Sequence, residues 1–141
     1  MFILLVVTPV TFYFCGNLET LDCSHNELTS LALRGCASLK NLKCSFNTLR
    51  SLDLTGCSSL EYLDCNTNFI ETMDVRGQAA LYYLNCNTNA LGTLAIADLA
   101  NLKYVDCSYN VLHDLSLVGL NRLETLYCQH NYIEALDFLQ C

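Results

Sequence analysis

The sequence is organised around one nine-residue stretch that returns every 21 residues. The first copy, LETLDCSHN, begins at Leu18. Five more follow: LKNLKCSFN from Leu39, LEYLDCNTN from Leu60, LYYLNCNTN from Leu81, LKYVDCSYN from Leu102 and LETLYCQHN from Leu123. A period of this length is typical of a solenoid, in which each unit buries its apolar face by stacking on a neighbour. Function must therefore be sought on the faces of the stack rather than in one enclosed pocket.

Within each copy, apolar and polar residues alternate as they do in a half-buried β-strand. In the first copy Leu21 and Cys23 are expected to face inward, whereas Thr20, Asp22 and Ser24 face outward. The alternation falls at the same place in every copy. We therefore expect the strands to stack as one parallel sheet, with neighbours ~4.8 Å apart.

An asparagine closes every copy without exception. Its side-chain amide can both donate and accept, so it can satisfy backbone groups where the chain leaves the sheet. The residues that follow, such as Leu28, Leu31 and Leu33, have apolar counterparts in every unit and are expected to form the return side of each coil. In the first five units a glycine then closes the unit at a tight bend, except where Asp98 replaces it.

The pattern LxxLxCxxNxLxxLxLxGCxx resembles the leucine-rich repeat family, over residues 18–141. The 21-residue length, with Cys where most such repeats carry Leu, resembles the cysteine-ladder type of internalin-like bacterial surface proteins. The resemblance implies a right-handed, curved solenoid with a parallel β-sheet on its concave face and an extended or 3₁₀ convex face. It also implies a binding role rather than catalysis, and an extracellular or cell-surface location.

The repeat domain is expected to span residues 18–141 as six units, the last incomplete. Residues 1–17 allow two interpretations. The apolar run Phe2–Val7 hints at a secretory signal, but no Lys or Arg precedes it and no small-x-small cleavage site follows. Counting back 21 residues from the return side of the first unit instead gives apolar residues, which favours a degenerate half-repeat. The matching residues are Val7, Val10, Phe12 and Cys15.

No polar cap follows the last unit, although the terminal units of a solenoid need one to shield the core. We therefore expect further repeats in a longer array, or end-to-end self-association. The apolar run near the start is too short to span a bilayer, so no membrane insertion is expected. A net charge of −7, with only seven scattered Lys and Arg, argues against nucleic acid and against an anionic membrane surface as partners.

Ten cysteines would ordinarily suggest a disulfide scaffold, but their spacing argues otherwise. Six of them lie 21 apart in the inward-facing ladder column: Cys23, Cys44, Cys65, Cys86, Cys107 and Cys128. In-register neighbours would hold their Cβ atoms ~4.8 Å apart, beyond the ~3.5–4.5 Å of a disulfide. Buried free thiols are the favoured interpretation. A metal ladder is the alternative, which no CxxC pair or Cys–His spacing supports, so no metal or cofactor is expected.

The outward strand positions provide the candidate site. Tyr62, Tyr83 and Tyr104 share one column, and exposed Tyr favours interfaces because it offers contact area and a hydrogen-bonding tip at little entropic cost. The full set of candidate ligand-binding residues is Tyr62, Asp64, Tyr83, Asn85, Tyr104, Asp106, Tyr109 and Tyr127. The alternative interpretation is that the Tyr rings only support cross-strand packing.

Catalysis has little support in the sequence. A nucleophile needs a base within hydrogen-bond reach, but the ladder cysteines face inward, away from His25 and His130. The recurring carboxylates Asp22, Asp64 and Asp106 would lie about 10 Å apart, too far to share one cation. We therefore predict a module that binds a protein or glycan ligand on its concave, Tyr-rich face. The alternative is a structural spacer within a larger surface protein, with no ligand of its own.

Overall fold

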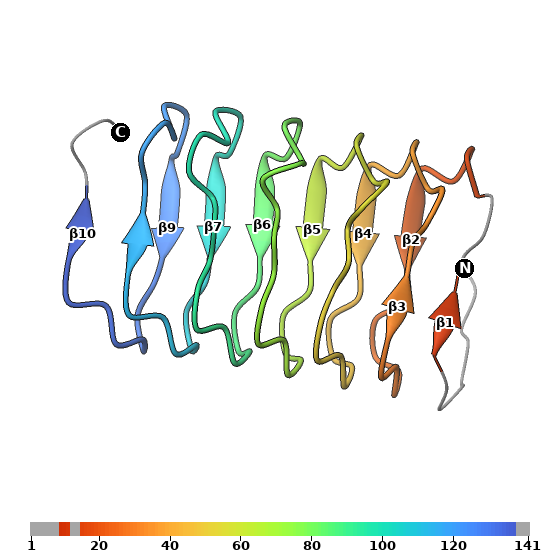
Figure 1. Cartoon of the computed structure of the whole chain (residues 1–141), viewed down its shortest axis with the longest axis horizontal. Helices are drawn as coiled ribbons and strands as arrows, with labels where there is room; N and C mark the ends of the chain where they lie inside the picture. Colours follow the sequence, from red (N-terminus) through yellow and green to blue (C-terminus); the bar gives the residue numbers. More distant parts are fainter. Residues whose placement is uncertain (1–8, 12–14, 138–141) are drawn as a thin grey trace.

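The computed structural model describes residues 9–11 and 15–137, which form a stack of coils (Figure 1). Along one side, short strands form a single parallel sheet in the order β2-β4-β5-β6-β7-β9. These strands are β2 (Thr20–Asp22), β4 (Asn41–Lys43), β5 (Tyr62–Asp64), β6 (Tyr83–Asn85), β7 (Tyr104–Asp106) and β9 (Thr125–Tyr127). Each residue lies opposite the one 21 positions later, as Tyr62 lies opposite Tyr83. The predicted solenoid is confirmed.

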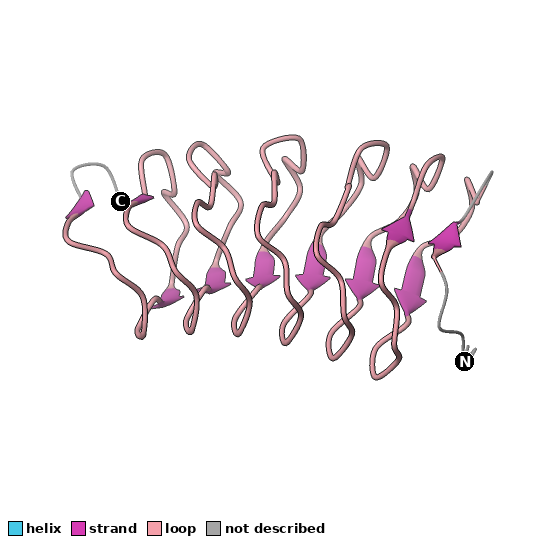
Figure 2. Ribbon diagram, turned by 60° about the horizontal axis from the view of Figure 1, so that its bottom comes forward, coloured by secondary structure: helices cyan, strands magenta, loops and turns pink. Residues whose placement is uncertain are grey.

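The return side of the coils is extended and carries only short parallel pairs (Figure 2). β1 (Val10–Thr11) pairs with β3 (Leu31–Ala32), and β8 (Leu115–Ser116) pairs with β10 (Leu136–Asp137). Each coil then closes through two successive turns. In the first unit, for example, Cys36 N–H donates to Leu33 O (3.2 Å) and Leu39 N–H to Cys36 O (3.0 Å).

The expected 3₁₀ conformation is therefore limited to isolated turns, because consecutive turns share a single residue and do not continue as a helix. Residues 9–11 and 15–137 contain no helical segment. Within the same residues, no helix is long and apolar enough to cross a membrane.

At the N-terminal end, Val10 lies opposite Leu31, which is the register obtained by counting back 21 residues. Residues 1–8 and 12–14, which include Val7 and Phe12, lie outside the described residues, as does Cys141 at the other end. The interpretation of residues 1–17 as a half-repeat, and the extent of the sixth unit, therefore stay predictions.

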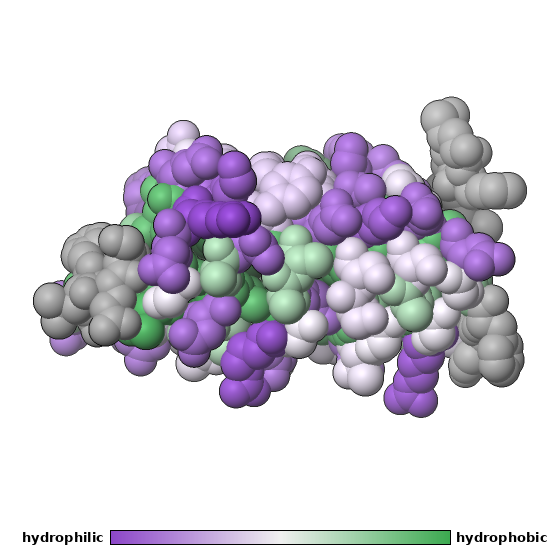
Figure 3. All heavy atoms as spheres, turned by 90° about the horizontal axis from the view of Figure 1, so that it is seen from above, coloured by the Kyte–Doolittle hydropathy of each residue, from purple (hydrophilic) through white to green (hydrophobic). Residues whose placement is uncertain are grey.

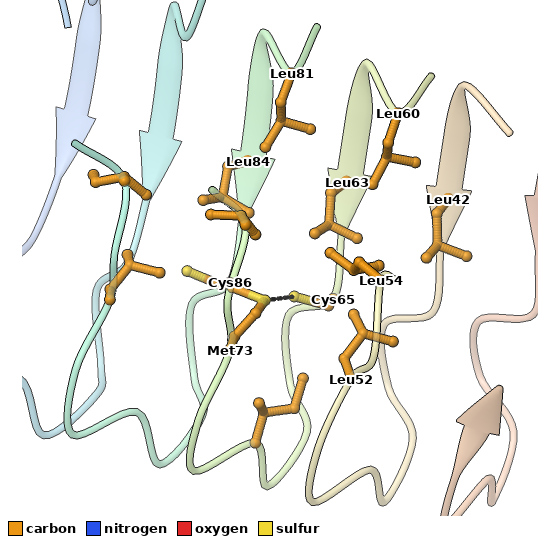
Figure 4. Packing of buried hydrophobic residues seen from close by; sticks show 14 of the residues in the cluster. Leu42, Leu52, Leu54, Leu60, Leu63, Cys65, Met73, Leu81, Leu84 and Cys86 are labelled. Carbon is orange, nitrogen blue, oxygen red and sulfur yellow. Dashed lines mark hydrogen bonds between the residues drawn. The ribbon is translucent and has the colours of Figure 1, made fainter. Parts of the chain in front are cut away.

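The core fills the space between the sheet and the return side (Figure 4). Leu63 and Leu84 project inward from the middle of their strands and are fully buried. From the return side, Met73 Sδ approaches Cys65 Sγ to 3.9 Å, so the two walls of a coil meet across the core. The central coils are packed throughout with such apolar contacts, which accounts for the repeated columns of Leu, Ile, Val and Met.

The ladder cysteines face this core, as predicted from their alternation with polar residues. Cys44, Cys65, Cys86 and Cys107 are buried, and these four are free thiols. Desolvation raises the pKa of Cys44 and Cys86 well above the usual thiol value and that of Cys107 to about 12. Since the thiolate is the reactive form, these side chains act as small apolar core residues rather than as nucleophiles.

The asparagine column forms a ladder of side-chain hydrogen bonds that ties each coil to the one before it. Asn68 Nδ2 donates to the carbonyl oxygens of Cys65 (3.1 Å) and Asn66 (3.2 Å) in its own coil, and to Cys44 O (3.1 Å) in the preceding coil. Its Oδ1 accepts the backbone N–H of Leu49 at 3.0 Å. One buried amide therefore satisfies backbone groups on both sides of a coil boundary, the role predicted for this column.

The same arrangement repeats along the stack. The Oδ1 atoms of Asn47, Asn89, Asn110 and Asn131 accept from the backbone N–H of Leu28, Ile70, Leu91 and Leu112, respectively, at 2.9–3.0 Å. Asn26, in the first coil, donates in the same way to Cys23 O at 2.9 Å, but its buried Oδ1 has no partner among the described residues.

We expect Asn68→Ala to lower the free energy of unfolding by about 2–4 kcal/mol, because it leaves a buried N–H and buried carbonyl groups without a hydrogen-bond partner. Asn101→Ala is the matched control. Asn101 also makes side-chain hydrogen bonds, to Ala79 O and Arg122, but it is exposed, so its loss should cost under ~1 kcal/mol. Urea denaturation measures both changes. Equal effects of the two substitutions would contradict the ladder's role.

We expect Cys65 and Cys86 to resist alkylation by iodoacetamide at pH 8 in the folded protein, because burial both blocks access and disfavours the thiolate. Half-buried Cys128 should react faster than either of them and serves as an internal control. Mass spectrometry of labelled peptides, with and without urea, resolves each site. Rapid labelling of Cys65 without denaturant would show that the cysteine column is open to solvent.

Candidate functional site

The outward side chains of the sheet form four parallel stripes that cross the strands. The Tyr stripe consists of Thr20, Asn41, Tyr62, Tyr83, Tyr104 and Thr125. Two positions along each strand, the acidic stripe consists of Asp22, Lys43, Asp64, Asn85, Asp106 and Tyr127. The amide stripe that follows, in which Ser45 and Ser108 are buried, consists of Ser24, Ser45, Asn66, Asn87, Ser108 and Gln129. The rim stripe, directly after it, consists of His25, Phe46, Thr67, Thr88, Tyr109 and His130.

The rings of the Tyr stripe stack face to face. The ring centroids of Tyr62 and Tyr83 lie 4.2 Å apart and those of Tyr83 and Tyr104 4.5 Å apart, each pair within 5° of parallel. Tyr127 adds an edge-on contact to Tyr104 at 5.9 Å. The in-register sheet imposes this stack, since it places the three Tyr Cα atoms directly opposite one another. As a result the neighbouring rings cover each other's faces.

The three phenol groups of the Tyr stripe influence one another's ionisation. Desolvation, followed by the repulsion of neighbouring phenolates, raises the pKa of Tyr83 and Tyr104 to about 12. The pKa of Tyr62 is also raised, chiefly by desolvation. These hydroxyls therefore stay protonated and neutral well above physiological pH, and can donate as well as accept hydrogen bonds.

The acidic stripe holds its carboxylates through local hydrogen bonds. Asp64 Oδ1 accepts from Asn66 Nδ2 at 2.6 Å. Asp106 Oδ1 accepts from Ser108 Oγ at 2.6 Å, and its Oδ2 accepts from Asn87 Nδ2 of the adjacent coil at 2.9 Å. Within the described part of the chain, neither carboxylate has an ion-pair partner. Their orientation is thus fixed while their charge is left uncompensated.

The cation nearest to this group is Lys43, which lies in the same stripe opposite Asp22 and Asp64. Its Nζ sits 5.8 Å from the ring centroid of Tyr62, a distance consistent with a weak cation–π contact. Lys43 therefore moderates the negative charge at the β2–β5 end of the stripe, and leaves the Asp106 end without a neighbouring cation.

The rim stripe has an unusual backbone conformation that the sequence does not predict. All six residues have φ between 52° and 57°, the left-handed region that non-glycine residues rarely occupy and that is least favourable for β-branched Thr67 and Thr88. Two ring pairs stack along it, His25 on Phe46 at 4.4 Å and Tyr109 on His130 at 4.3 Å. Recurrence of aromatic and His residues at a spacing of 21 was the sequence signal that could have revealed these pairs.

The structure thus brings most of the predicted site residues onto one continuous surface. Tyr62, Tyr83, Tyr104 and Tyr127 are in ring contact, and Asp64, Asn85 and Asp106 form the neighbouring stripe. Tyr109 lies apart, on the rim, where it is 54% exposed and stacks on His130 instead of joining the Tyr stripe. Whether these residues contact a ligand stays a prediction.

Other surfaces of the described residues offer less chemistry. A depression on the return side is lined by residues that include Asp53, Asp74 and Arg76. There the Arg76 guanidinium pairs with Asp74 at 2.6 Å and, mainly by hydrogen bonding, lowers the pKa of Asp74 to about 2. The edge seen from above in Figure 3 is a mixture of hydrophilic and intermediate residues, and hydrophobic residues (green) occupy only small areas of it. No group of three His, Cys, Asp or Glu in the described ranges could hold a metal ion.

Comparisons with known proteins agree with this geometry. Family models described as Leucine Rich Repeat and Leucine Rich repeats (2 copies) match residues 17–42 and 100–141, respectively. The structure is similar to the functional domain of InlJ from Listeria monocytogenes, which includes a cysteine ladder, with a TM-score of 0.83 and 31% identity. That match covers 86% of this chain and 27% of the InlJ chain.

A leucine-rich repeat protein from Leptospira interrogans is similar with a TM-score of 0.65 and 21% identity, over 86% of this chain and 40% of that one, which shows the fold alone. No curated protein sequence matches the chain. The repeat motif, the in-register parallel sheet with its cysteine ladder and the family-model matches together show that the chain belongs to the leucine-rich repeat family.

Proposed function

We propose that the chain is a protein-binding module whose ligand lies on the sheet face, centred on the Tyr stripe. The observation that carries this proposal is the row of stacked, half-exposed rings of Tyr62, Tyr83 and Tyr104. Membership of the leucine-rich repeat family supports a binding role over an enzymatic one. A cell-surface or secreted location remains part of the proposal and rests on the resemblance to bacterial surface proteins.

The Tyr stripe suits an interface because the sheet already holds its side chains in place. Rings fixed by stacking lose little rotamer entropy when a partner binds, so less of the contact energy is offset. Their neutral hydroxyls can donate to carbonyl groups of a ligand backbone. Asp64, Asn85, Asp106 and Tyr127 add charged and polar contacts alongside, and exposed Tyr109 extends the surface toward the rim.

A protein ligand fits this surface better than a glycan. Sugar rings bind aromatic side chains by stacking on open ring faces, but in the Tyr stripe neighbouring rings cover these faces at 4.2–4.5 Å. The parts of the Tyr rings that face outward are their edges and hydroxyl groups. These are suited to hydrogen bonding with an extended peptide. The structural-spacer alternative draws support from the same stacking, because an aromatic ladder stabilises a parallel sheet whether or not anything binds.

To test the proposal, a displayed library of random peptides is selected against the immobilised chain, and the enriched peptides are titrated against variants. We expect Tyr83→Ser to weaken their binding about tenfold or more, as for a residue at the centre of an interface. Tyr82→Ser is the matched control, because Tyr82 is the preceding residue, 41% exposed, and lies off the Tyr stripe. Its binding should change by less than about twofold.

Two results would count against the proposal. Enriched peptides that bind Tyr83→Ser and the unaltered chain equally would place the interface elsewhere. A library that yields no specific peptide would favour the spacer, unless a glycan array screened in parallel gives a ligand, in which case the ligand class is wrong. Circular dichroism of each variant checks that the fold is retained.

A further inference from the structure

Two periodic features of the sheet face restrict the shape of an extended ligand that crosses the strands. The Tyr stripe provides a line of ring edges across β5, β6 and β7. Beside it, Asp64 and Asp106 are separated by Asn85, so the two carboxylates repeat every second strand. At a strand spacing of ~4.8 Å, they lie about 10 Å apart along the stack.

The charge of this face favours a basic ligand. At neutral pH the four stripes carry three carboxylates, Asp22, Asp64 and Asp106, against the single cation Lys43, and His25 and His130 are formally neutral. The whole chain is also acidic, with a net charge of −7, so a basic segment is attracted at long range. The Asp64–Asp106 half of the acidic stripe has no ion-pair partner among the described residues, which leaves its charge available to a ligand.

Arginine matches these carboxylates better than lysine does. Each Asp already has at least one oxygen engaged by a neighbouring amide or hydroxyl, so its plane is fixed. Each Oδ1 already accepts two hydrogen bonds, so the lone pairs open to a ligand lie mainly on Oδ2. A planar guanidinium can donate to that oxygen and still lie against aromatic edges, whereas an ammonium acts as a point charge.

The spacing selects the conformation of the ligand backbone. A polyproline II segment has three residues per turn and rises ~3.1 Å per residue, so residues i and i+3 lie on one face ~9.3 Å apart. This nearly equals the separation of Asp64 and Asp106. In a β-strand, residues on one face recur every ~6.6 Å, which matches neither one strand spacing nor two. In other proteins, polyproline II segments are recognised by aromatic-lined grooves, so aromatic side chains are common partners of this backbone conformation.

We propose that the sheet face binds a polyproline II segment of a protein partner that carries arginines at positions i and i+3. The segment lies across β5, β6 and β7 on the ring edges of the Tyr stripe, with one arginine on Asp64 and the next on Asp106. This inference rests on the proposed function and specifies the chemistry of its ligand.

Three synthetic peptides test the spacing without altering the protein. The matching peptide is acetyl-PPRPPRPP-amide, and its isomer acetyl-PPRPRPPP-amide has the same composition with arginines at i and i+2. The third peptide replaces both arginines of the first with neutral citrulline. Measured by isothermal titration calorimetry at 50 mM salt, the matching peptide should bind at least about threefold more tightly than its isomer, and the citrulline peptide should bind at least about tenfold more weakly.

A matched pair of variants tests the carboxylate. Asp106→Asn removes the charge but keeps an oxygen that can accept the Ser108 N–H, so the turn is preserved. We expect it to weaken binding of the matching peptide about three- to tenfold. Asp114→Asn makes the same charge change at an exposed residue off the four stripes, and should leave affinity within about twofold.

Equal affinity for the two arginine spacings, equal effects of Asp106→Asn and Asp114→Asn, or no binding of the matching peptide would each overturn this inference. These outcomes are separable from failure of the proposed function. Library peptides that require Tyr83 but lack an arginine pair and ignore Asp106→Asn would leave the protein-binding role standing. Peptides whose affinity is unchanged by Tyr83→Ser would instead contradict the proposed function itself.

Discussion

The structure depends on the asparagine ladder, the line of buried amides that joins each coil to the next. Parallel strands of three residues make few backbone hydrogen bonds, and at the end of each strand the chain turns away and leaves carbonyl and N–H groups without partners. Asn47, Asn68, Asn89 and Asn110 supply those partners from within the core. Because each Asn bonds to its own coil and to the preceding one, it also fixes the register at 21 residues.

This register has consequences on both faces of the sheet. Inside, it aligns the cysteine column, where a small apolar side chain packs against return-side residues such as Met73. Outside, it aligns Tyr62, Tyr83 and Tyr104 so closely that their rings stack. The proposed binding surface is therefore a product of the same constraint that stabilises the core. Its side chains are held by the sheet before any ligand arrives, which lowers the entropic cost of binding.

Much of the fold could be predicted from the sequence because the repeat is nearly exact in the columns that matter. The alternation of Leu63 and Cys65 with Tyr62 and Asp64 specified the strand, its faces and its register. Less of the site could be predicted. The left-handed backbone of the rim stripe gave only a weak signal. His25 and His130 are of a residue type that is enriched at positive φ, but the Phe, Thr and Tyr at the other four positions are not.

The covering of the Tyr ring faces could not be predicted either, since a shared column shows that side chains are neighbours but not how their rings are oriented. The same holds for Tyr109. Its spacing placed it beyond the strand, but only the structure shows that it pairs with His130 rather than with the Tyr stripe. The sequence left a protein and a glycan ligand equally open, and it is the orientation of the Tyr rings, rather than residue identity, that favours a protein.

Amide hydrogen exchange tests the central claim most directly, because it reports on the individual N–H groups that the ladder binds. The backbone amides of Leu49 and Leu91, which donate to Asn68 and Asn110, should be among the slowest to exchange. The backbone amide of Thr93 lies at an exposed residue of the return side and should exchange much faster. Exchange of Leu49 and Leu91 as fast as that of Thr93 would contradict the account, because it would mean that the coils are not held in register by their asparagines.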